Sequence, residues 1–354
     1  MSASALQPVS IAGRVIEPGA PLFVVAELSA NHNGTLDQAL AIMRAAKAAG
    51  ADAIKLQTYT ADTITIDHAG PGFRIEQGLW RGRTLHDLYQ EAHTPWDWHG
   101  ALFEEGRALG LPVFSSPFDA SAIAFLEHFD PPAYKIASFE LVDVGLIRAA
   151  AKTGKPIILS TGMASFAEIE EAVTAARSAG ARQIVLLHCT SGYPTPPEEA
   201  NLRTIPHLAE TFGVPVGLSD HTLGIGVALA AVALGACLIE KHVTLRRAEG
   251  GPDAAFSLEP DELKSLIDNA RLAHAALGRV TYERRASEAG NAAFRRSLYV
   301  VRDMKAGDAL TPETLRSIRP GHGLHPRQYD ELLGLRVTRD VARGTPMSWD
   351  LIGR

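Results

Sequence analysis

The sequence predicts an α/β protein: a (β/α)8 TIM barrel followed by a small C-terminal domain. First, six Ala-rich stretches each end in a glycine, and an apolar run begins two or three residues later. Because glycine favours the left-handed conformation that closes a helix, each unit indicates a helix, its cap and a buried strand. Second, eight apolar runs are present in all, the number of strands that closes this barrel. Third, the 354 residues exceed the roughly 250 that a barrel needs.

Eight strands are expected, at residues 22–28, 53–59, 112–116, 133–138, 156–161, 184–190, 215–221 and 238–244. Most are continuous apolar runs, which is typical of parallel strands covered on both faces. Helices are expected in the intervals, including 36–49 after Thr35, 167–179 after Ser165, 224–234 and a last one at 260–277. The stretch 60–94 is too long for a simple connection, and such loops on the catalytic face commonly contribute to substrate binding or form a lid.

The domain boundaries follow from where this pattern stops. We expect the barrel at 1–280, a polar linker at 281–293 and the small domain at 294–354. Within the small domain, the segment that starts at Arg302 is echoed 37 residues later by the segment that starts at Arg339. Two similar halves with short apolar runs and glycine turns predict a compact pseudo-symmetric module.

Composition limits the class of protein. Hydrophobic residues make up 46% of the chain and charged residues 21%, so we expect it to fold throughout. No apolar run reaches the roughly 18 residues of a membrane helix, and the first eight residues lack a signal-peptide pattern. We therefore expect a cytoplasmic protein with no membrane partner and with Cys189 and Cys237 as reduced thiols. The net charge of −6 argues against a nucleic-acid partner.

Two histidines end neighbouring predicted strands, His221 and His242. Adjacent strands lie about 4.8 Å apart, so the two imidazoles can share one divalent ion, beside Asp220, Glu240 and Asp253. Each histidine by itself would more simply be a satisfied polar group or a general base. The identity of the metal stays open because imidazole and oxygen donors suit several ions.

Two lysines, Lys55 and Lys135, also end predicted strands, where an unpaired ammonium group would be costly to bury. Carboxylates of the protein could pair with them. Convergence on one mouth with five serines instead favours a small ligand that carries phosphate and carboxylate groups. These serines are Ser116, Ser138, Ser160, Ser191 and Ser219.

Two glutamates complete the predicted mouth of the barrel. Glu27 ends the first strand and is a candidate base or substrate anchor. Glu140 could accept hydrogen bonds from sugar hydroxyls or pair with a lysine. The sequence contains no P-loop and no Gly-x-Ser-x-Gly elbow, which excludes those two types of site.

Taken together, these motifs resemble the sialic acid synthase family, whose members condense phosphoenolpyruvate with an amino-sugar aldehyde to make nine-carbon keto acids. The resemblance covers nearly the whole chain and is carried by Ala26-Glu-Leu-Ser-Ala-Asn-His32-Asn33, Lys55-Leu-Gln57-Thr58, Ser116-Pro-Phe118, Lys135-Ile-Ala-Ser138, Leu159-Ser160-Thr-Gly-Met163, His188-Cys-Thr-Ser191-Gly-Tyr193-Pro194, Ser219-Asp-His221-Thr222, Glu240-Lys-His242 and Gly251-Pro-Asp253. The C-terminal domain resembles the family's antifreeze-like (SAF) domain through Arg296-Ser297 and Arg319-Pro-Gly-His-Gly323.

The resemblance implies a role for each matching residue. It assigns a metal, usually Mn²⁺ or Mg²⁺, to His221 and His242. It implies that phosphoenolpyruvate is bound by Lys55, Ser116, Lys135, Ser138, Ser160, Ser191 and Ser219, and that the reacting centre or the sugar lies near Glu27, Gln57, Glu140, Tyr193 and Asp253. It also implies a domain-swapped homodimer in which Arg319 reaches the sugar's acylamino group from the partner. Sialic acid synthases commonly have Thr and Asn at the positions of Ser116 and Ser191, which leaves the individual roles of these two serines open.

The segment around Glu27 resembles the pseudaminic acid branch of the family rather than the Glu-x-Gly-x-Asn-His form of N-acetylneuraminate synthases. The sugar of that branch is 2,4-diacetamido-2,4,6-trideoxy-altrose, and the reaction releases phosphate by C–O cleavage. Alternatives are an N-acetylneuraminate or legionaminate synthase with another acylamino hexose, and a condensing enzyme for a phosphorylated aldose. An alternative of another class is a sugar-binding protein that kept the barrel and lost the chemistry.

Overall fold

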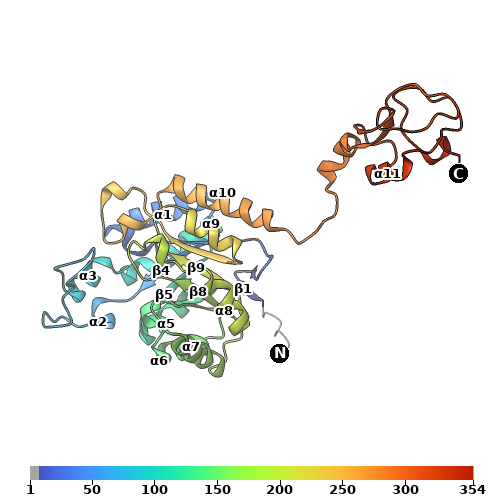
Figure 1. Ribbon diagram of the computed structural model, residues 1–354. Coiled ribbons are helices and arrows are strands. Elements are labelled where there is room, and N and C mark those ends of the chain that lie inside the picture. Colours follow the sequence, from blue (N-terminus) through green and yellow to red (C-terminus); the bar gives the residue numbers. More distant parts are fainter. Residues whose placement is uncertain (1–7, 354) are drawn as a thin grey trace. The chain divides into compact units, whose positions relative to one another are not determined.

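The computed structural model describes residues 8–353 in two compact units, Met1–Gly278 and Arg279–Arg354, and each unit is considered by itself (Figure 1). Residues 1–7, on which the expectation of no signal peptide partly rests, and Arg354 lie outside the described range. Among the described residues, no helix combines the length and apolarity needed to cross a membrane.

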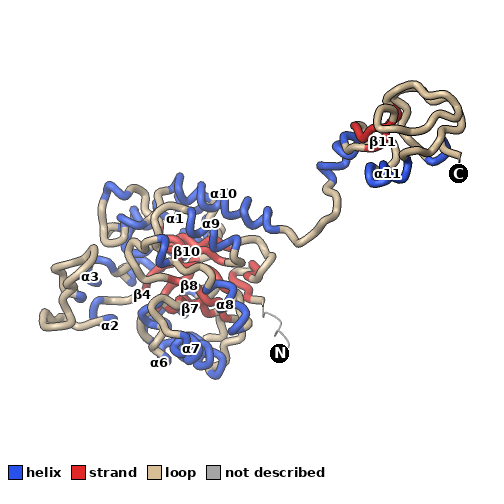
Figure 2. Tube along the Cα trace, in the orientation of Figure 1, coloured by secondary structure: helices blue, strands red, loops and turns tan. Residues whose placement is uncertain are grey.

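The first unit is a closed barrel of eight parallel strands, which confirms the predicted fold (Figure 2). Each strand pairs with the next along the chain, and the last closes on the first. All eight lie close to the expected positions: β3 (Phe23–Glu27), β4 (Ala53–Thr58), β5 (Val113–Pro117), β6 (Tyr134–Ile136), β7 (Ile157–Ser160), β8 (Ile184–Cys189), β9 (Val216–Asp220) and β10 (Leu238–His242). In this arrangement their C-terminal ends meet at one mouth, where functional residues gather.

Helices cover the outside of the barrel and begin and end at the expected signals. The Thr35 side chain accepts a hydrogen bond from the Gln38 amide at the start of α1, and Gly50, with a φ of 97°, closes it. Ser165 forms a capping box with Glu168 at the start of α7. The outer helices are α1 (Leu36–Ala49), α4 (His99–Leu109), α5 (Ala120–Leu126), α6 (Val144–Lys152), α7 (Phe166–Ser178), α8 (Thr204–Phe212), α9 (Gly226–Ala233) and α10 (Pro260–Leu277).

An N-terminal hairpin that the sequence analysis did not predict closes the other end of the barrel. Its strands β1 (Val9–Ile11) and β2 (Arg14–Ile16) are antiparallel. Val9, Ile11 and Ile16 are buried in one cluster with Phe23 and Leu238, the first residues of β3 and β10. Because apolar side chains fill this end, the polar residues of the barrel interior are left to the mouth.

The long segment between β4 and α4 has structure of its own. It contains α2 (Ala61–Ile64) and α3 (Leu85–Ala92), and its strand-like parts meet in an antiparallel bridge between Arg74 and Thr84. Figure 1 shows it projecting beyond the end of β4. It is an ordered addition to the barrel mouth rather than a plain connection.

The second unit has the internal symmetry that its repeat predicts. Strands β11 (Ser297–Val300) and β12 (Leu315–Ile318) are antiparallel, and α11 (Tyr329–Leu332) follows them. Met304 and Val341, which occupy equivalent positions of the two halves, exchange both backbone hydrogen bonds, each of 2.8–2.9 Å. Such an exchange between equivalent residues is what a local two-fold axis produces. The stretch expected as a linker contains most of a 3-10 helix, Ala286–Phe294.

Candidate functional site

A cavity of about 440 Å³ lies at the C-terminal ends of the barrel strands. Strands β4, β5, β6, β9 and β10 and the segments that follow them supply its polar wall. Eleven of the predicted site residues line it: Lys55, Gln57, Ser116, Lys135, Ser138, Glu140, Tyr193, Ser219, His221, His242 and Asp253. A volume of this size suits a small-molecule substrate.

Four predicted residues do not line this cavity. Glu27 is fully buried behind Lys55. Ser160 is also fully buried, and its hydroxyl has no hydrogen-bond partner. Ser191 is only half-buried, and its Oγ lies 4.0 Å from the sulfur of Cys189. Arg319 is exposed and belongs to the C-terminal unit.

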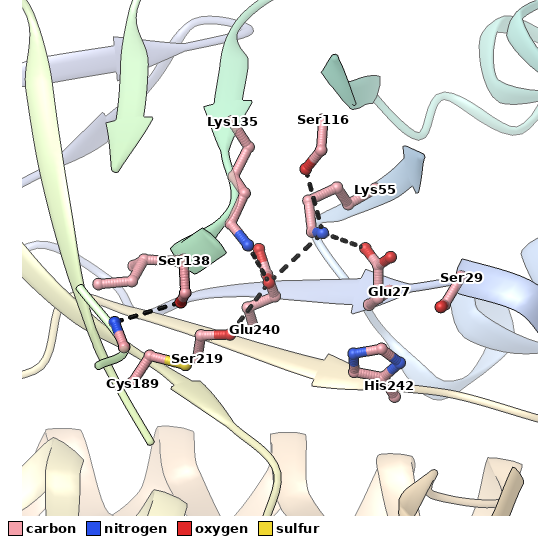
Figure 3. Close-up of polar contacts among 12 residues, drawn as sticks. Glu27, Ser29, Lys55, Ser116, Lys135, Ser138, Cys189, Ser219, Glu240 and His242 are labelled. Carbon is pink, nitrogen blue, oxygen red and sulfur yellow. Dashed lines mark hydrogen bonds and ion pairs between the residues drawn. The ribbon is translucent and has the colours of Figure 1, made fainter. Parts of the chain in front are cut away.

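The two lysines share one buried carboxylate, that of Glu240. Its Oε1 lies 3.5 Å from Lys55 Nζ and 3.3 Å from Lys135 Nζ, and it accepts a hydrogen bond of 3.1 Å from Ser219 (Figure 3). Lys55 is also 2.6 Å from Glu27 Oε2. The lysines therefore pair with carboxylates of the protein, which was one of the two alternatives. They also line the cavity, which the other alternative, a ligand with phosphate and carboxylate groups, requires. Their charge is held in place before any substrate arrives.

Burial and pairing set the charge of this cluster. Burial raises the pKa of Glu240, but the two lysine charges outweigh it, so its net pKa is below the ordinary value. For Glu27, burial outweighs the Lys55 charge and the net pKa is raised. Burial would lower the pKa of Lys55, but Glu240 and Glu27 raise it overall. Glu240 is thus the carboxylate that stays ionised between the two ammonium groups.

The two histidines lie next to each other at the ends of the neighbouring strands β9 and β10. Their ring centroids lie 5.3 Å apart, and the ring planes are inclined by 56°. His221 Nδ1 lies 3.2 Å from the Thr190 carbonyl oxygen, to which it donates, and this fixes the proton on Nδ1 and leaves Nε2 as the ligand atom. His242 Nδ1 is buried without a hydrogen-bond partner, 3.8 Å from Asp253 Oδ2.

Imidazoles in this arrangement suit a divalent cation. A metal needs ring nitrogens that carry a free lone pair. His242 Nδ1 has no hydrogen-bond partner, and the tautomer of His221 leaves its Nε2 unprotonated, so each ring offers one such nitrogen. Within residues 8–353 no cluster of three or more His, Cys, Asp or Glu side chains is arranged to hold a metal. A cation bound by the two histidines would therefore keep positions open for substrate and water.

Cys189 belongs to this mouth, although the sequence analysis gave it no role there. Its sulfur lies 3.8 Å from His221 Nδ1. Burial raises the pKa of the thiol, but the contacts with His221 and Ser138 and the charge of Lys135 together outweigh burial, and the net pKa is lowered. Strand periodicity contained the signal, because Val185 and Leu187 face the barrel interior and Cys189 is next in that series.

The remaining lining is aromatic and aliphatic, and sequence reasoning missed most of it. Tyr193, which was predicted, has its ring centroid 4.5 Å from that of His221 and 5.7 Å from that of Trp80. Further lining residues are Tyr59, Ile64, Ile75, Leu85, Leu88, Tyr89, Ala92, Phe118, Ala137, Phe139 and Pro252. Large parts of this set come from the segment 60–94. The helical spacing of Leu85, Leu88, Tyr89 and Ala92 after the Thr84 cap was a signal that the sequence analysis did not use.

Comparison with known proteins identifies the family that carries this site. Residues 42–282 match the NeuB family, and residues 295–353 match the SAF domain. The chain belongs to the NeuB family. This confirms the family resemblance and the nature of the C-terminal domain, whose match begins within two residues of β11.

Relatives of this NeuB-family chain extend over nearly all of it. It is 45% identical to the pseudaminic acid synthase of Campylobacter jejuni over 91% of this chain and 94% of the relative. It is 43% identical to the pseudaminic acid synthase of Helicobacter pylori over 94% and 98%. The crystal structure of N-acetylneuraminic acid synthetase from Leptospira borgpetersenii in complex with citrate is similar at a TM-score of 0.73 and 34% identity, covering 81% of this chain and 95% of that one.

Proposed function

We propose that this NeuB-family chain is a pseudaminic acid synthase. It condenses phosphoenolpyruvate with 2,4-diacetamido-2,4,6-trideoxy-altrose to a nine-carbon 2-keto acid and releases phosphate. The observation that carries the proposal is one cavity lined by both the lysine pair and the histidine pair, in a chain 43–45% identical to pseudaminic acid synthases along nearly its whole length. The identity to an N-acetylneuraminic acid synthetase is lower, at 34%, which favours the 2,4-diacetamido-2,4,6-trideoxy sugar over the sugar of N-acetylneuraminate synthases.

The lysine cluster is the binding site for phosphoenolpyruvate. Lys55 and Lys135, with the hydroxyls of Ser116 and Ser138, offer charge-assisted hydrogen bonds to a phosphate and a carboxylate. Glu240 keeps both ammonium groups in the cavity in the absence of substrate. Glu27 does not line the cavity, so we assign it the role of holding Lys55 rather than that of a base.

The chemistry needs an activated aldehyde and a water molecule. A divalent cation, Mn²⁺ or Mg²⁺, held by His221 and His242 would polarise the aldehyde carbonyl. The cavity holds C3 of phosphoenolpyruvate against the carbonyl carbon, and their bond leaves positive character at C2. Asp253, which lines the same cavity, orients the water that adds at C2. The tetrahedral intermediate then loses phosphate by C–O cleavage.

A cytoplasmic homodimer completes the proposal. Apolar side chains that follow the C-terminal ends of β6, β7 and β9 are strongly exposed: Phe139 at 56%, Met163 at 65% and Leu223 at 62%. A second copy of the chain, with its C-terminal unit over the barrel mouth, would cover them and bring Arg319 to the sugar.

Phosphate release tests the function. Purified protein is incubated with Mn²⁺, phosphoenolpyruvate and a set of acylamino hexoses, and the products are identified by mass spectrometry. The expected result is phosphate and a nine-carbon keto acid from the 2,4-diacetamido-2,4,6-trideoxy sugar, with oxygen from labelled water in the keto acid. Label in phosphate would contradict C–O cleavage. Turnover of another acylamino hexose or a sugar phosphate alone would identify the corresponding alternative, and no turnover would favour the sugar-binding protein.

A further inference from the structure

The segment 60–94 turns an apolar surface toward the cavity. From its residues the cavity is lined by Ile64, Ile75, Trp80, Leu85, Leu88, Tyr89 and Ala92. None of its many Asp, Glu, Arg and His side chains lines the cavity. We call Ile64, Ile75, Trp80, Leu85 and Leu88 the apolar wall; Tyr89, which brings a hydroxyl group to the cavity from the same helix as Leu85 and Leu88, is not part of it. Side chains that could have entered the protein core instead stand at a substrate cavity.

Contacts away from the cavity hold the wall in shape. Arg83 pairs with Asp87 at 2.8 Å and with Glu91 at 2.6 Å on the outer side of α3. Ile75 and its neighbours form a small hairpin in which the Gly82 amide donates to the Ile75 carbonyl oxygen at 2.8 Å. The wall is therefore present before a ligand binds, which is the condition for selective recognition.

Trp80 joins the wall to the reacting centre. Its Nε1 donates a hydrogen bond of 2.9 Å to the Pro252 carbonyl oxygen, next to Asp253. Its ring lies 5.7 Å from that of Tyr193, which in turn lies 4.5 Å from His221. Because the indole N–H is already used, the side chains of the wall offer a ligand no free hydrogen-bond donor or acceptor.

The cavity thus has two chemically different sides. The lysines, histidines and serines can satisfy a phosphorylated acid and an aldehyde, so the part of the sugar remote from the aldehyde extends toward the wall. A hydroxyl group placed against Ile75 and Leu85 would lose its water and find no partner in the side chains of the wall, whereas a methyl group would gain from burial.

We propose that the apolar wall selects a sugar that carries a methyl group in place of a hydroxymethyl group at C6. This rests on the proposed function, and it adds the residues that discriminate between such sugars. An apolar pocket rejects a substrate that merely adds a hydroxyl group by on the order of 100-fold in kcat/KM. We expect that ratio between the two sugars.

The test uses two 2,4-diacetamido hexoses of the same configuration that differ only in the group at C6. Phosphate release gives kcat/KM for each, and their ratio does not depend on the folded fraction of a variant. The wild type should favour the methyl sugar by about 100-fold, and Ile75→Thr and Leu85→Asn should bring the ratio to about tenfold or less. Ile66→Thr and Leu79→Asn are matched controls, because Ile66 and Leu79 are 59% and 49% exposed and do not line the cavity.

Equal turnover of the two sugars by the wild type, or an equal loss of preference in the controls, would overturn the role of the wall while leaving the proposed function intact. No turnover of either sugar, with turnover of a different acylamino hexose, would overturn the proposed function and the wall with it. The two failures are therefore distinguishable in one set of assays.

Discussion

Lys241 Nζ lies 2.8 Å from Asp220 Oδ2, and both side chains are buried, one residue away from His242 and His221 respectively. The two residues are register partners on β9 and β10. Because His242 and Glu240 line the cavity, the intervening Lys241 faces the other side of its strand. Asp220 also accepts hydrogen bonds from the amide and hydroxyl of Thr222, at 2.9 and 2.8 Å. This ion pair fixes the two strand ends that carry the histidines.

Breaking this pair should destabilise the barrel. Lys241→Met leaves the Asp220 charge buried without a partner, and we expect a loss of roughly 3–5 kcal/mol in the free energy of unfolding. In the double variant that also carries Asp220→Asn, most of the lost stability should return, because neither charge of the pair remains buried. Urea denaturation measures both. Lys264→Met is the control, since Lys264 lies at the same 2.8 Å from Asp268 but on the surface, where a pair contributes about 0.5 kcal/mol. Equal losses in the two single variants would contradict this account.

Removing one imidazole should abolish metal binding and turnover without unfolding the protein. We expect His221→Ala to lose the bound Mn²⁺ signal in electron paramagnetic resonance and to release no phosphate, while the circular dichroism spectrum is unchanged. His128→Ala, at an exposed position outside the cavity, should retain both. A metal-stripped wild type that keeps most of its activity would rule out the metal.

Glu140 should make stability depend on pH near neutrality. Burial raises the pKa of this carboxyl from 4.5 to about 7, although Lys135 opposes the shift. Between these pH values the folded state keeps a proton that the unfolded state has lost, so stability falls as the pH rises through this window. Glu140→Gln cannot titrate. Relative to the wild type, it should therefore gain stability between about pH 5 and about pH 8 in urea denaturation. A difference in the free energy of unfolding between the two proteins that does not change over this pH range would contradict the raised pKa of Glu140.

Much of the barrel could be predicted because its signals are local. The Thr35 cap and the Gly50 closure bound α1 within the chain itself, and the continuous apolar runs mark the strands. Strand ends of a parallel barrel must meet, so Lys55, Lys135, His221 and His242 could be brought together without coordinates.

What escaped prediction depends on contacts between distant segments. That Glu240 bridges both lysines follows from the register of β10, which no local pattern sets. Glu27 was expected to line the cavity, but Lys55 lies between the Glu27 carboxylate and the cavity. The lining by Ile75 and Leu85 depends on how a 35-residue insertion folds back over the cavity. The helical spacing of Leu85, Leu88 and Ala92 marks α3 within it, but no local pattern shows where that helix packs.

Lys135 should contribute to the binding of phosphoenolpyruvate more than to stability. Lys135→Met removes one of the two ammonium groups at the cavity, while Glu240 keeps Lys55 as a partner 3.5 Å away. Loss of a charge-assisted hydrogen bond should raise the KM for phosphoenolpyruvate by about 10–100-fold. Steady-state kinetics at saturating sugar measure this. Lys155→Met, which removes a lysine paired with Asp130 outside the cavity, should leave the KM unchanged.

Subunit mixing tests the domain-swapped dimer. If Arg319 acts on the partner's cavity, a hybrid of His221→Ala and Arg319→Ala chains has one site that contains both wild-type residues and one that contains neither. If each chain serves its own cavity, both sites of the hybrid carry one defect. Each variant alone should be inactive, and an equal mixture that exchanges subunits freely should recover about a quarter of the wild-type activity. No recovery, with hybrids present in native mass spectrometry, would show that Arg319 does not act across the dimer.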